Sequence, residues 1–190
     1  MRVIIFIEGG NRAESRNFSD AFKLLFKKIN PSLQNIDIRI QRDRGRVVRD
    51  FTKEYNKQGH RDDCRILMLI DGEKPRSPNS TAHSHIKETD KNLKMDHIPE
   101  DAVYIMQICM ESWLISDSNQ FPEVDFAGHS DLLGKAKVDE LINQASKLKY
   151  NLEYHKIDHG IKFIANLDPQ VAKQKSHSFN EFYHGLARLF

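Results

Sequence analysis

Three short apolar runs, each followed by acidic residues, constrain the fold of this chain most strongly. The runs cover residues 3–7 (VIIFI), 66–70 (ILMLI) and 103–108 (VYIMQI). Their length and their β-branched residues favour buried strands over helices. Stretches with apolar residues at helical spacing separate them, such as the one that begins at Phe18. This alternation predicts an α/β fold with a mostly parallel central sheet and helices on both faces.

The rest of the chain divides into segments of different character. A further strand is expected over residues 36–40, where isoleucines alternate with Asp37 and Arg39. Residues 74–100 contain three prolines and few apolar residues, which predicts a long irregular excursion with one short helix. Residues 135–190 show helical spacing, and the last helix has Ser178 as a plausible cap. One helix in this part should turn these residues inward: Val138, Leu141, Ile142, Ala145 and Leu148.

Composition indicates a single domain over residues 1–190 with a helical C-terminal part over 135–190. With 39% apolar and 29% charged residues, the chain has the make-up of an ordinary soluble domain. No apolar stretch approaches the roughly 20 residues that cross a bilayer, so no membrane partner is expected. The two cysteines are too few to suggest a disulfide framework, and no signal-peptide pattern is visible. We therefore expect a cytoplasmic protein.

Acidic residues follow the strands of the predicted sheet. Glu8 ends the first apolar run, Asp71 and Glu73 follow the third strand, and Glu111 follows the fourth. The carboxyl ends of parallel strands meet at one edge, where open α/β sheets bind ligands. Clustered carboxylates repel one another, and a divalent cation such as Mg²⁺ or Mn²⁺ is the usual compensation. The pattern predicts a metal site, although each acid alone is also explained as a solvated strand end, a tight turn or a helix N-terminal acid.

Basic residues offer possible contacts to nucleic acid, which the net charge of +2 does not itself indicate. Five arginines fall within residues 39–49, and guanidinium groups suit phosphate because their planar fork donates two hydrogen bonds. The alternative is a solvated helix start whose arginines pair with acids such as Asp43 and Asp50. The predicted nucleic-acid contacts are Arg42, Arg44, Arg46 and Arg49.

The sequence gives weaker evidence of a functional role for several other residues. Lys156 would neutralise charge on a phosphate if it lay near a metal, and is otherwise an ordinary surface lysine. Glu14 and Asp117 are additional acids whose roles the sequence leaves open. Two histidine pairs, at 83 and 85 and at 155 and 159, lack the third ligand that a zinc site needs, so we interpret them as solvated.

Taken in order, these segments resemble a known family pattern from residue 3 to about residue 189. The segments are Glu8-Gly9-Gly10, Gly45-Arg46 with Phe51, Asp71-Gly72-Glu73, Cys109 to Trp113 continuing through Asp117, Tyr154 with Lys156, and Leu167-Asp168-Pro169. The pattern is similar to a bacterial family of small TOPRIM-like proteins that is catalogued as a domain of unknown function. Members of that family tend to be encoded beside an AAA/ABC-type ATPase in defence-like gene pairs.

The resemblance implies a TOPRIM-like layout, related to that of the OLD-type nucleases. By that likeness, Glu8 corresponds to the glutamate after the first strand, Asp71 and Glu73 to an acidic pair, Glu111 to a further acid, and Lys156 to a late lysine. The pair departs from the usual pattern because its second member is Glu where the pattern has Asp. The loop from Asn11 to Ser15 departs as well, which leaves any role for Glu14 open.

The implied function is a Mg²⁺- or Mn²⁺-dependent nuclease that acts on DNA or RNA as the effector of a bacterial defence pair, with an ATPase partner. The alternative is a TOPRIM-fold regulatory or binding subunit of an ATPase that performs no catalysis. A third interpretation is a phosphotransfer enzyme or phosphatase on a flavodoxin-like sheet. Aromatic residues near the C-terminus, Tyr183 and Phe190, would suit a homodimer or another partner surface.

Overall fold

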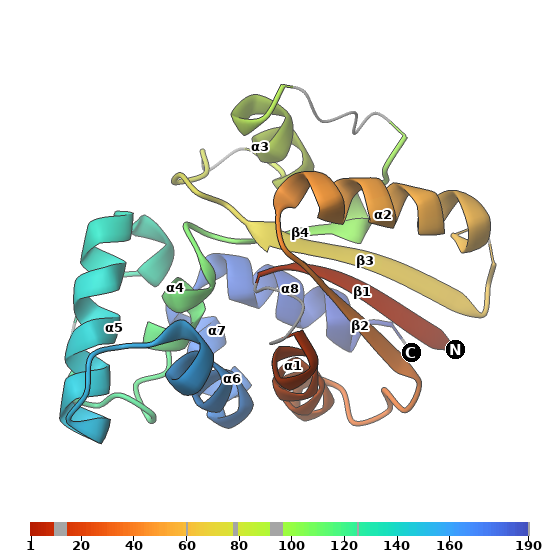
Figure 1. Ribbon diagram of the computed structural model, residues 1–190. Helices are drawn as coiled ribbons and strands as arrows, with labels where there is room; N and C mark the ends of the chain where they lie inside the picture. The colour runs from red at the N-terminus through yellow and green to blue at the C-terminus, as the bar shows by residue number, and fades with distance from the viewer. Residues whose placement is uncertain (10–14, 60, 78–79, 92–96, 125, 190) are drawn as a thin grey trace.

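A computed structural model describes residues 1–9, 15–59, 61–77, 80–91, 97–124 and 126–189 (Figure 1). In these ranges the chain forms a four-stranded, all-parallel sheet with the strand order β2-β1-β3-β4. The strands are β1 (Arg2–Glu8), β2 (Ile36–Gln41), β3 (Cys64–Asp71) and β4 (Val103–Met106). The predicted α/β class with a parallel sheet is confirmed, and the arrangement is consistent with a TOPRIM-like fold.

Helices make up the rest of the regular structure. The first three, which alternate with the strands, are α1 (Ser15–Ile29), α2 (Arg44–Gln58) and α3 (Ala82–Thr89). After β4 come α4 (Met110–Ile115), α5 (Lys135–Tyr150), α6 (Ile161–Asn166), α7 (Pro169–Lys175) and α8 (His177–Ala187). Short 3₁₀ turns cover Glu100–Ala102 and Ser130–Leu132, and a π-helical turn covers Lys156–Gly160. The part of the chain that follows β4 is therefore helical, as its spacing predicted.

The two faces of the sheet are covered by different helices. In Figure 1, α2 and α3 lie on one side of the sheet, and α1 and α8 lie on the other. Alternate residues of β1 explain this, because Ile4 and Phe6 join one buried cluster while Val3, Ile5 and Ile7 join the other. Both faces of β1 are buried, which is why its sequence is continuously apolar rather than alternating.

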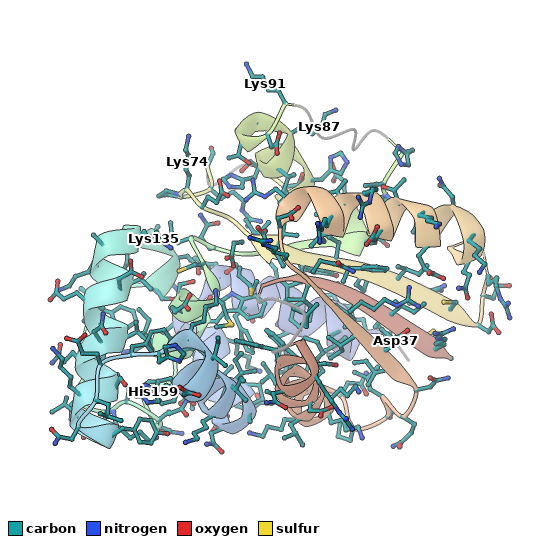
Figure 2. The ribbon with its side chains drawn as sticks, in the orientation of Figure 1. Asp37, Lys74, Lys87, Lys91, Lys135 and His159 are labelled. Carbon is teal, nitrogen blue, oxygen red and sulfur yellow. The ribbon has the colours of Figure 1, made fainter. Side chains whose placement is uncertain are left out.

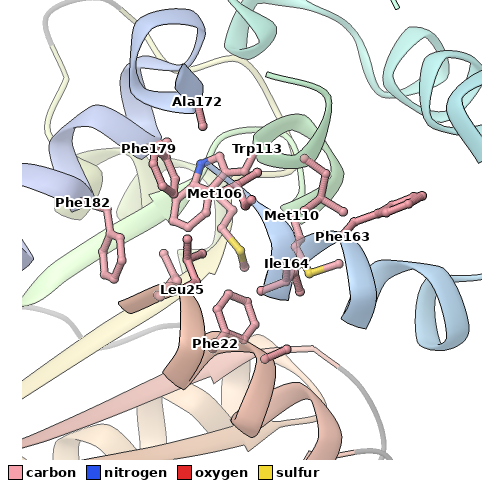
Figure 3. Close-up of a cluster of buried hydrophobic side chains, with 14 of the residues drawn as sticks. Phe22, Leu25, Met106, Met110, Trp113, Phe163, Ile164, Ala172, Phe179 and Phe182 are labelled. Carbon is pink, nitrogen blue, oxygen red and sulfur yellow. The ribbon is translucent and has the colours of Figure 1, made fainter. Parts of the chain in front are cut away.

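The larger core cluster joins α1 to the helices that follow β4 (Figure 3). Trp113 of α4 contacts Phe179 and Phe182 of α8, with ring centroids 4.9 and 5.5 Å apart. Phe182 also contacts Phe26 of α1 at 5.0 Å. These contacts fix the helical C-terminal part against the sheet, and they leave the carboxyl ends of the strands facing α4 and α5 (Figure 1).

The strand order places a topological switch point between β1 and β3. From β1 the chain moves outward to β2, then crosses back to form β3 on the other side of β1. Ligands of open α/β sheets bind beyond the carboxyl ends of the strands at such a point. The last residues of these two strands are Glu8 and Asp71. The topology therefore singles out the position that the acidic pattern indicated.

Two local predictions in the C-terminal part are wrong. The cap of α8 is Ser176, whose side chain accepts a hydrogen bond from the amide of Phe179, while Ser178 lies inside the helix. Leu148 is 57% exposed, because Ser146 and Tyr150 face the core in the last turns of α5 instead.

The predicted excursion over residues 74–100 is described in part. The one short helix expected within residues 74–100 is α3, while Leu93 and Met95 of that stretch lie outside the described residues. None of the described helices is both long enough and apolar enough to cross a membrane.

Candidate metal and active site

Glu8 and Asp71 lie side by side at the switch point. The Glu8 Oε2 atom accepts a hydrogen bond from the backbone amide of Asp71 at 3.2 Å. The Glu8 side chain is only 16% exposed, although it ends a strand. Burial raises the pKa of Glu8, and its partners Arg44 and Asp71 oppose that rise. The two acids that the sequence predicted at one edge of the sheet are therefore direct neighbours.

Asp71 has a buried carboxylate oxygen without a partner. Its Oδ1 atom is fully buried and accepts no hydrogen bond from the described residues. Burial raises the pKa of Asp71 from 3.8 to about 7, and the nearby charges of Glu8 and Glu111 add to the rise, while Lys156 and Lys135 oppose it. A buried carboxylate without a donor is costly. An oxygen in this state is a suitable ligand for a cation.

The Asp71-Gly72-Glu73 turn is fixed against the chain that leaves β4. The amides of Gly72 and Glu73 donate to the carbonyls of Met106 and Ile108 at 2.7 and 2.9 Å. A Cβ atom on Gly72 would lie 3.2 Å from the Ile108 amide nitrogen, so this close approach favours a glycine. Glu73 has a positive φ of 58°, and its side chain is 58% exposed. The turn thus presents Glu73 to solvent beside the more buried Asp71.

Helix α3 of the excursion supports the same turn. His85 is buried, and its Nε2 atom lies 2.8 Å from the carbonyl oxygen of Gly72. The interpretation of His85 as solvated is wrong, because the ring is buried against the Asp71-Gly72-Glu73 turn. The polar stretch 74–100 therefore contributes a residue that holds the loop between Asp71 and Glu73.

Arg44 lies among the acids. Its side chain, at the start of α2, is 7% exposed, and its guanidinium donates to the backbone carbonyl of Asp71 and to Thr89 Oγ1. Its Nε atom lies 3.8 Å from Glu8 Oε2, and Nη2 lies 3.4 Å from Glu73 Oε1. Arg44 therefore offsets part of the negative charge of the site, and its buried Nε atom has no hydrogen-bond partner among the described residues.

A second group of polar residues surrounds Glu111, which is buried in the first turn of α4. The Tyr154 hydroxyl donates to Glu111 Oε1 at 3.1 Å, and Lys156 Nζ lies 3.7 Å from the same oxygen. Burial lowers the pKa of Lys156, but Glu111 and Asp71 more than offset this, so the net shift is upward and the lysine is charged. Burial also raises the pKa of Tyr154, and raises that of Cys109 to about 12. Tyr154 is therefore a hydrogen-bond donor that holds Glu111 in place.

Two residues of this region were not predicted as site residues. Lys135 lies at the start of α5 (Figure 2). It is close enough to Asp71 to lower the pKa of that carboxyl group. Tyr154 contacts Glu111 across 43 residues of sequence. No periodicity or spacing marks either residue, because both reach the site only through the packing of the C-terminal helices. The segment Tyr154 with Lys156 was visible only as part of a family pattern.

The other predicted arginines lie on the exposed side of the start of α2. Arg46 pairs with Asp43 at 3.4 Å and Arg49 with Asp50 at 2.9 Å, which is the acid pairing considered as the alternative. Arg42 is exposed. Exposed pairs of this kind contribute little to stability, and they dissociate readily in favour of a polyanion.

The sequence also singled out Asp117, Glu14, Tyr183 and Phe190. Asp117 is buried and accepts hydrogen bonds from the amides of Asn119, Gln120 and Asp168, so it joins the turn after α4 to the start of α7. Glu14 lies outside the described residues, as does Phe190. The second aromatic residue near the C-terminus, Tyr183, is half-buried.

The second histidine pair is divided between solvent and core. His155 is exposed and pairs with Asp158 at 2.9 Å. His159 is buried, with its Nδ1 atom 2.8 Å from Ser146 Oγ, so its interpretation as solvated is wrong.

The acidic site offers only some of the oxygen ligands that a divalent cation such as Mg²⁺ takes. Across the described ranges, no three His, Cys, Asp or Glu side chains are grouped so that they could hold a metal ion. The unpartnered Oδ1 of Asp71, beside the Glu8 carboxylate, is the observation that favours an ion here. Carboxylate oxygens are the ligands that Mg²⁺ takes, usually one or two of them together with water and substrate phosphate.

Comparison with known proteins gives a family without a described activity. No curated protein and no solved structure matches the chain. A family model described as a domain of unknown function (DUF4276) matches residues 19–187, which is most of the chain. The match includes the strands and helices that carry Asp71, Glu73, Glu111 and Lys156. The chain therefore belongs to the DUF4276 family.

Proposed function

We propose that this protein hydrolyses phosphodiester bonds in nucleic acid with the help of Mg²⁺ or Mn²⁺. The observation that carries the proposal is the pair Glu8 and Asp71 at the switch point, where Asp71 has a buried oxygen without a partner. Glu8 and Asp71 would hold the ion, with the exposed Glu73 and the buried Glu111 as further acids beside them. When bound, such an ion activates water and offsets charge on the phosphate.

The protein residues around the acids have complementary tasks. Lys156 stays charged and faces the same carboxylates, so it supports a phosphate whose negative charge grows in the transition state. Tyr154 holds Glu111 in one orientation. Arg44 fixes the carbonyl of Asp71 and limits repulsion between Glu8 and Glu73. Exposed Arg42, Arg46 and Arg49 would bind the nucleic-acid backbone farther from the acids.

The biological setting is a separate proposal that rests on the family resemblance. In that setting the protein is the nuclease effector of a bacterial defence gene pair, acting in the cytoplasm with an AAA/ABC-type ATPase partner. Purification of the protein with the product of a neighbouring ATPase gene tests this pairing, and the absence of any complex would count against it.

A cleavage assay tests the activity. Purified protein is incubated with single-stranded and duplex DNA and RNA in Mg²⁺ or Mn²⁺, beside the variants Glu8→Ala and Asp71→Ala. We expect cleavage by the wild type and its loss in both variants. Asp62→Ala is the matched control, because Asp62 is an exposed acid just before β3, at the opposite edge of the sheet. Cleavage that survives in both site variants would refute the assignment.

One observation favours a second candidate, a binding module that performs no catalysis. Arg44 already offsets the negative charges of Glu8 and Glu73. An arginine therefore supplies the positive charge that a metal ion would supply in the nuclease. Calorimetric titration with Mn²⁺ separates the two candidates. An inert module shows no ion binding that depends on Glu8, whereas the nuclease binds Mn²⁺ and loses this binding in Glu8→Ala.

A further inference from the structure

A cavity of about 440 Å³ lies at the carboxyl end of β4, next to the acidic site but separate from it. We call it the β4-end cavity. It is enclosed by the loop after β3, the residue that follows β4, the 3₁₀ turn Ser130–Leu132 and the first turn of α8. The residues that matter for its chemistry are Arg76, Gln107, Leu132, His177, Asn180 and Glu181. Its volume falls within the range of pockets that bind small ligands.

The backbone of Gln107 forms the partition between this cavity and the acids. On one side, a Cβ atom on Gly72 would lie 3.3 Å from the Gln107 Cα atom, and Gly72 is the middle residue of the acidic turn. On the other side, Gln107 lines the β4-end cavity, and its side-chain Nε2 atom donates to the carbonyl of Lys74. A ligand in the cavity therefore lies beside the turn that carries Asp71 and Glu73.

The charged groups in the cavity wall are already compensated. Arg76 pairs with Glu181 through both of its terminal nitrogens, one of them at 2.8 Å from Glu181 Oε2. Asp131 accepts hydrogen bonds from Ser176 Oγ and from the amide and hydroxyl of Ser178, at 2.7 to 3.0 Å. Because no unpaired charge faces the cavity among the residues that line it, its wall suits a neutral group better than a phosphate.

The wall also offers flat and apolar surface. Leu132 is 71% exposed, although it borders the cavity. The His177 ring lines the cavity and is stacked on His129, with centroids 3.7 Å apart. The amide side chain of Asn180 supplies a donor and an acceptor, while the side-chain amide nitrogen of Gln107 already donates to Lys74. Bases of single-stranded nucleic acid bind proteins through this combination of flat side chains and amide groups.

From these features we infer that the β4-end cavity binds an unpaired nucleobase next to the phosphate held at the acidic site. This inference rests on the proposed nuclease function and adds that the substrate is single-stranded. A duplex keeps its bases stacked and would have to extrude one, whereas a single strand offers an unpaired base at little cost.

Fluorescence anisotropy tests the inference apart from the cleavage assay, because the protein is titrated with Ca²⁺, which takes the same kind of oxygen ligands, in place of Mg²⁺ or Mn²⁺. The probes are a labelled single-stranded 12-mer of mixed sequence and a 12-mer of abasic residues with the same phosphates. We expect Leu132→Ala and His177→Ala each to weaken binding of the base-containing strand by about 5- to 100-fold. Binding of the abasic strand should change less than about twofold, since its phosphates contact other residues.

Two matched variants control for exposed surface. Leu148→Ala removes an exposed leucine of α5, and His184→Ala removes an exposed histidine at the far end of α8. Neither should change binding of either strand. Because Leu132 and His177 are exposed, their replacement should leave the fold intact, and circular dichroism checks this.

The outcomes separate the inference from the proposed function. If the wild type cleaves nucleic acid but both cavity variants bind the base-containing strand as tightly as the wild type, the cavity assignment is wrong and the nuclease remains. Preference of the wild type for duplex over single strands would have the same meaning. If the wild type neither binds nor cleaves any nucleic acid, both proposals fail.

Discussion

Replacing Asp71 with asparagine should make this protein more stable at alkaline pH. The side chain keeps its shape and loses its charge, and burial is the main reason that this charge is unfavourable. The pKa of Asp71 is about 7 in the folded protein against an ordinary value of 3.8. Since the folded value is the higher one, the stabilising contribution of the protonated group is complete below about pH 4. It is lost as the pH rises through about 7.

The size of the effect follows from the shift. A change from 3.8 to about 7 is about 3 pH units, and each unit corresponds to about 1.4 kcal/mol. The free energy of unfolding of Asp71→Asn should therefore match that of the wild type near pH 4. It should exceed the wild-type value by up to about 4 kcal/mol at pH 8.

Urea denaturation at each pH from 4 to 8, in EDTA so that no divalent ion contributes, measures this difference. Asp62→Asn is the control, because Asp62 is exposed and its replacement should give a curve parallel to that of the wild type. The reasoning is refuted if the difference between Asp71→Asn and the wild type is the same at every pH. An asparagine variant that is less stable than the wild type at pH 8 would refute it as well.

Two further predictions concern residues that hold the acids in place. His85→Ala leaves the Gly72 carbonyl without its buried partner and should lower the free energy of unfolding by about 1–3 kcal/mol in urea denaturation. His85→Asn, which keeps a donor, should lose less. Tyr154→Phe removes one hydrogen bond to the Glu111 carboxylate and should cost about 1.5–3 kcal/mol, as measured by thermal unfolding. Equal stability of the variant and the wild type would show that this hydrogen bond is absent in solution.

The sheet and its functional edge could be predicted because they depend on local sequence. β1 and β3 are buried on both faces, so their sequences are continuously apolar and easily distinguished from helices. Parallel strands separated by helices must then end at one edge, so the sequence alone predicts that Glu8 and Asp71 lie at the same edge. The helical spacing that begins at Phe18 was likewise visible, and Phe18, Phe22 and Leu25 of α1 are all buried.

The residues that offset the charge of the acids or hold the acidic turn could not be predicted, because tertiary packing determines which side chains reach the site. Arg44 is one of several arginines in a polar stretch, and only the burial of the start of α2 separates it from its exposed neighbours. His85 lies in a segment without apolar periodicity. Ser176 and Ser178 are equally good caps by composition, and the contacts of Ser178 with Trp113 and Asp131 decide between them.

Arg44 is also the residue that best separates the enzyme from the inert module. Arg44→Gln removes a buried guanidinium that offsets the charges of Glu8 and Glu73. Breaking a buried ion pair typically costs about 3–5 kcal/mol, since the remaining charges lose their compensation. Both candidate functions predict this loss in EDTA. They differ in what an added divalent ion should do.

If the site binds Mn²⁺, the ion replaces the missing positive charge, so Arg44→Gln should regain stability as Mn²⁺ is added. Saturation at about 100 times the dissociation constant would contribute about 2.7 kcal/mol. The wild type should gain less, because Arg44 competes with the ion for the same carboxylates. Thermal unfolding with and without Mn²⁺ measures both gains, and Glu8→Ala combined with Arg44→Gln is the control that should lose the rescue. If Mn²⁺ leaves Arg44→Gln unstabilised, the carboxylates do not form a cation site, and the binding module becomes the better account of this fold.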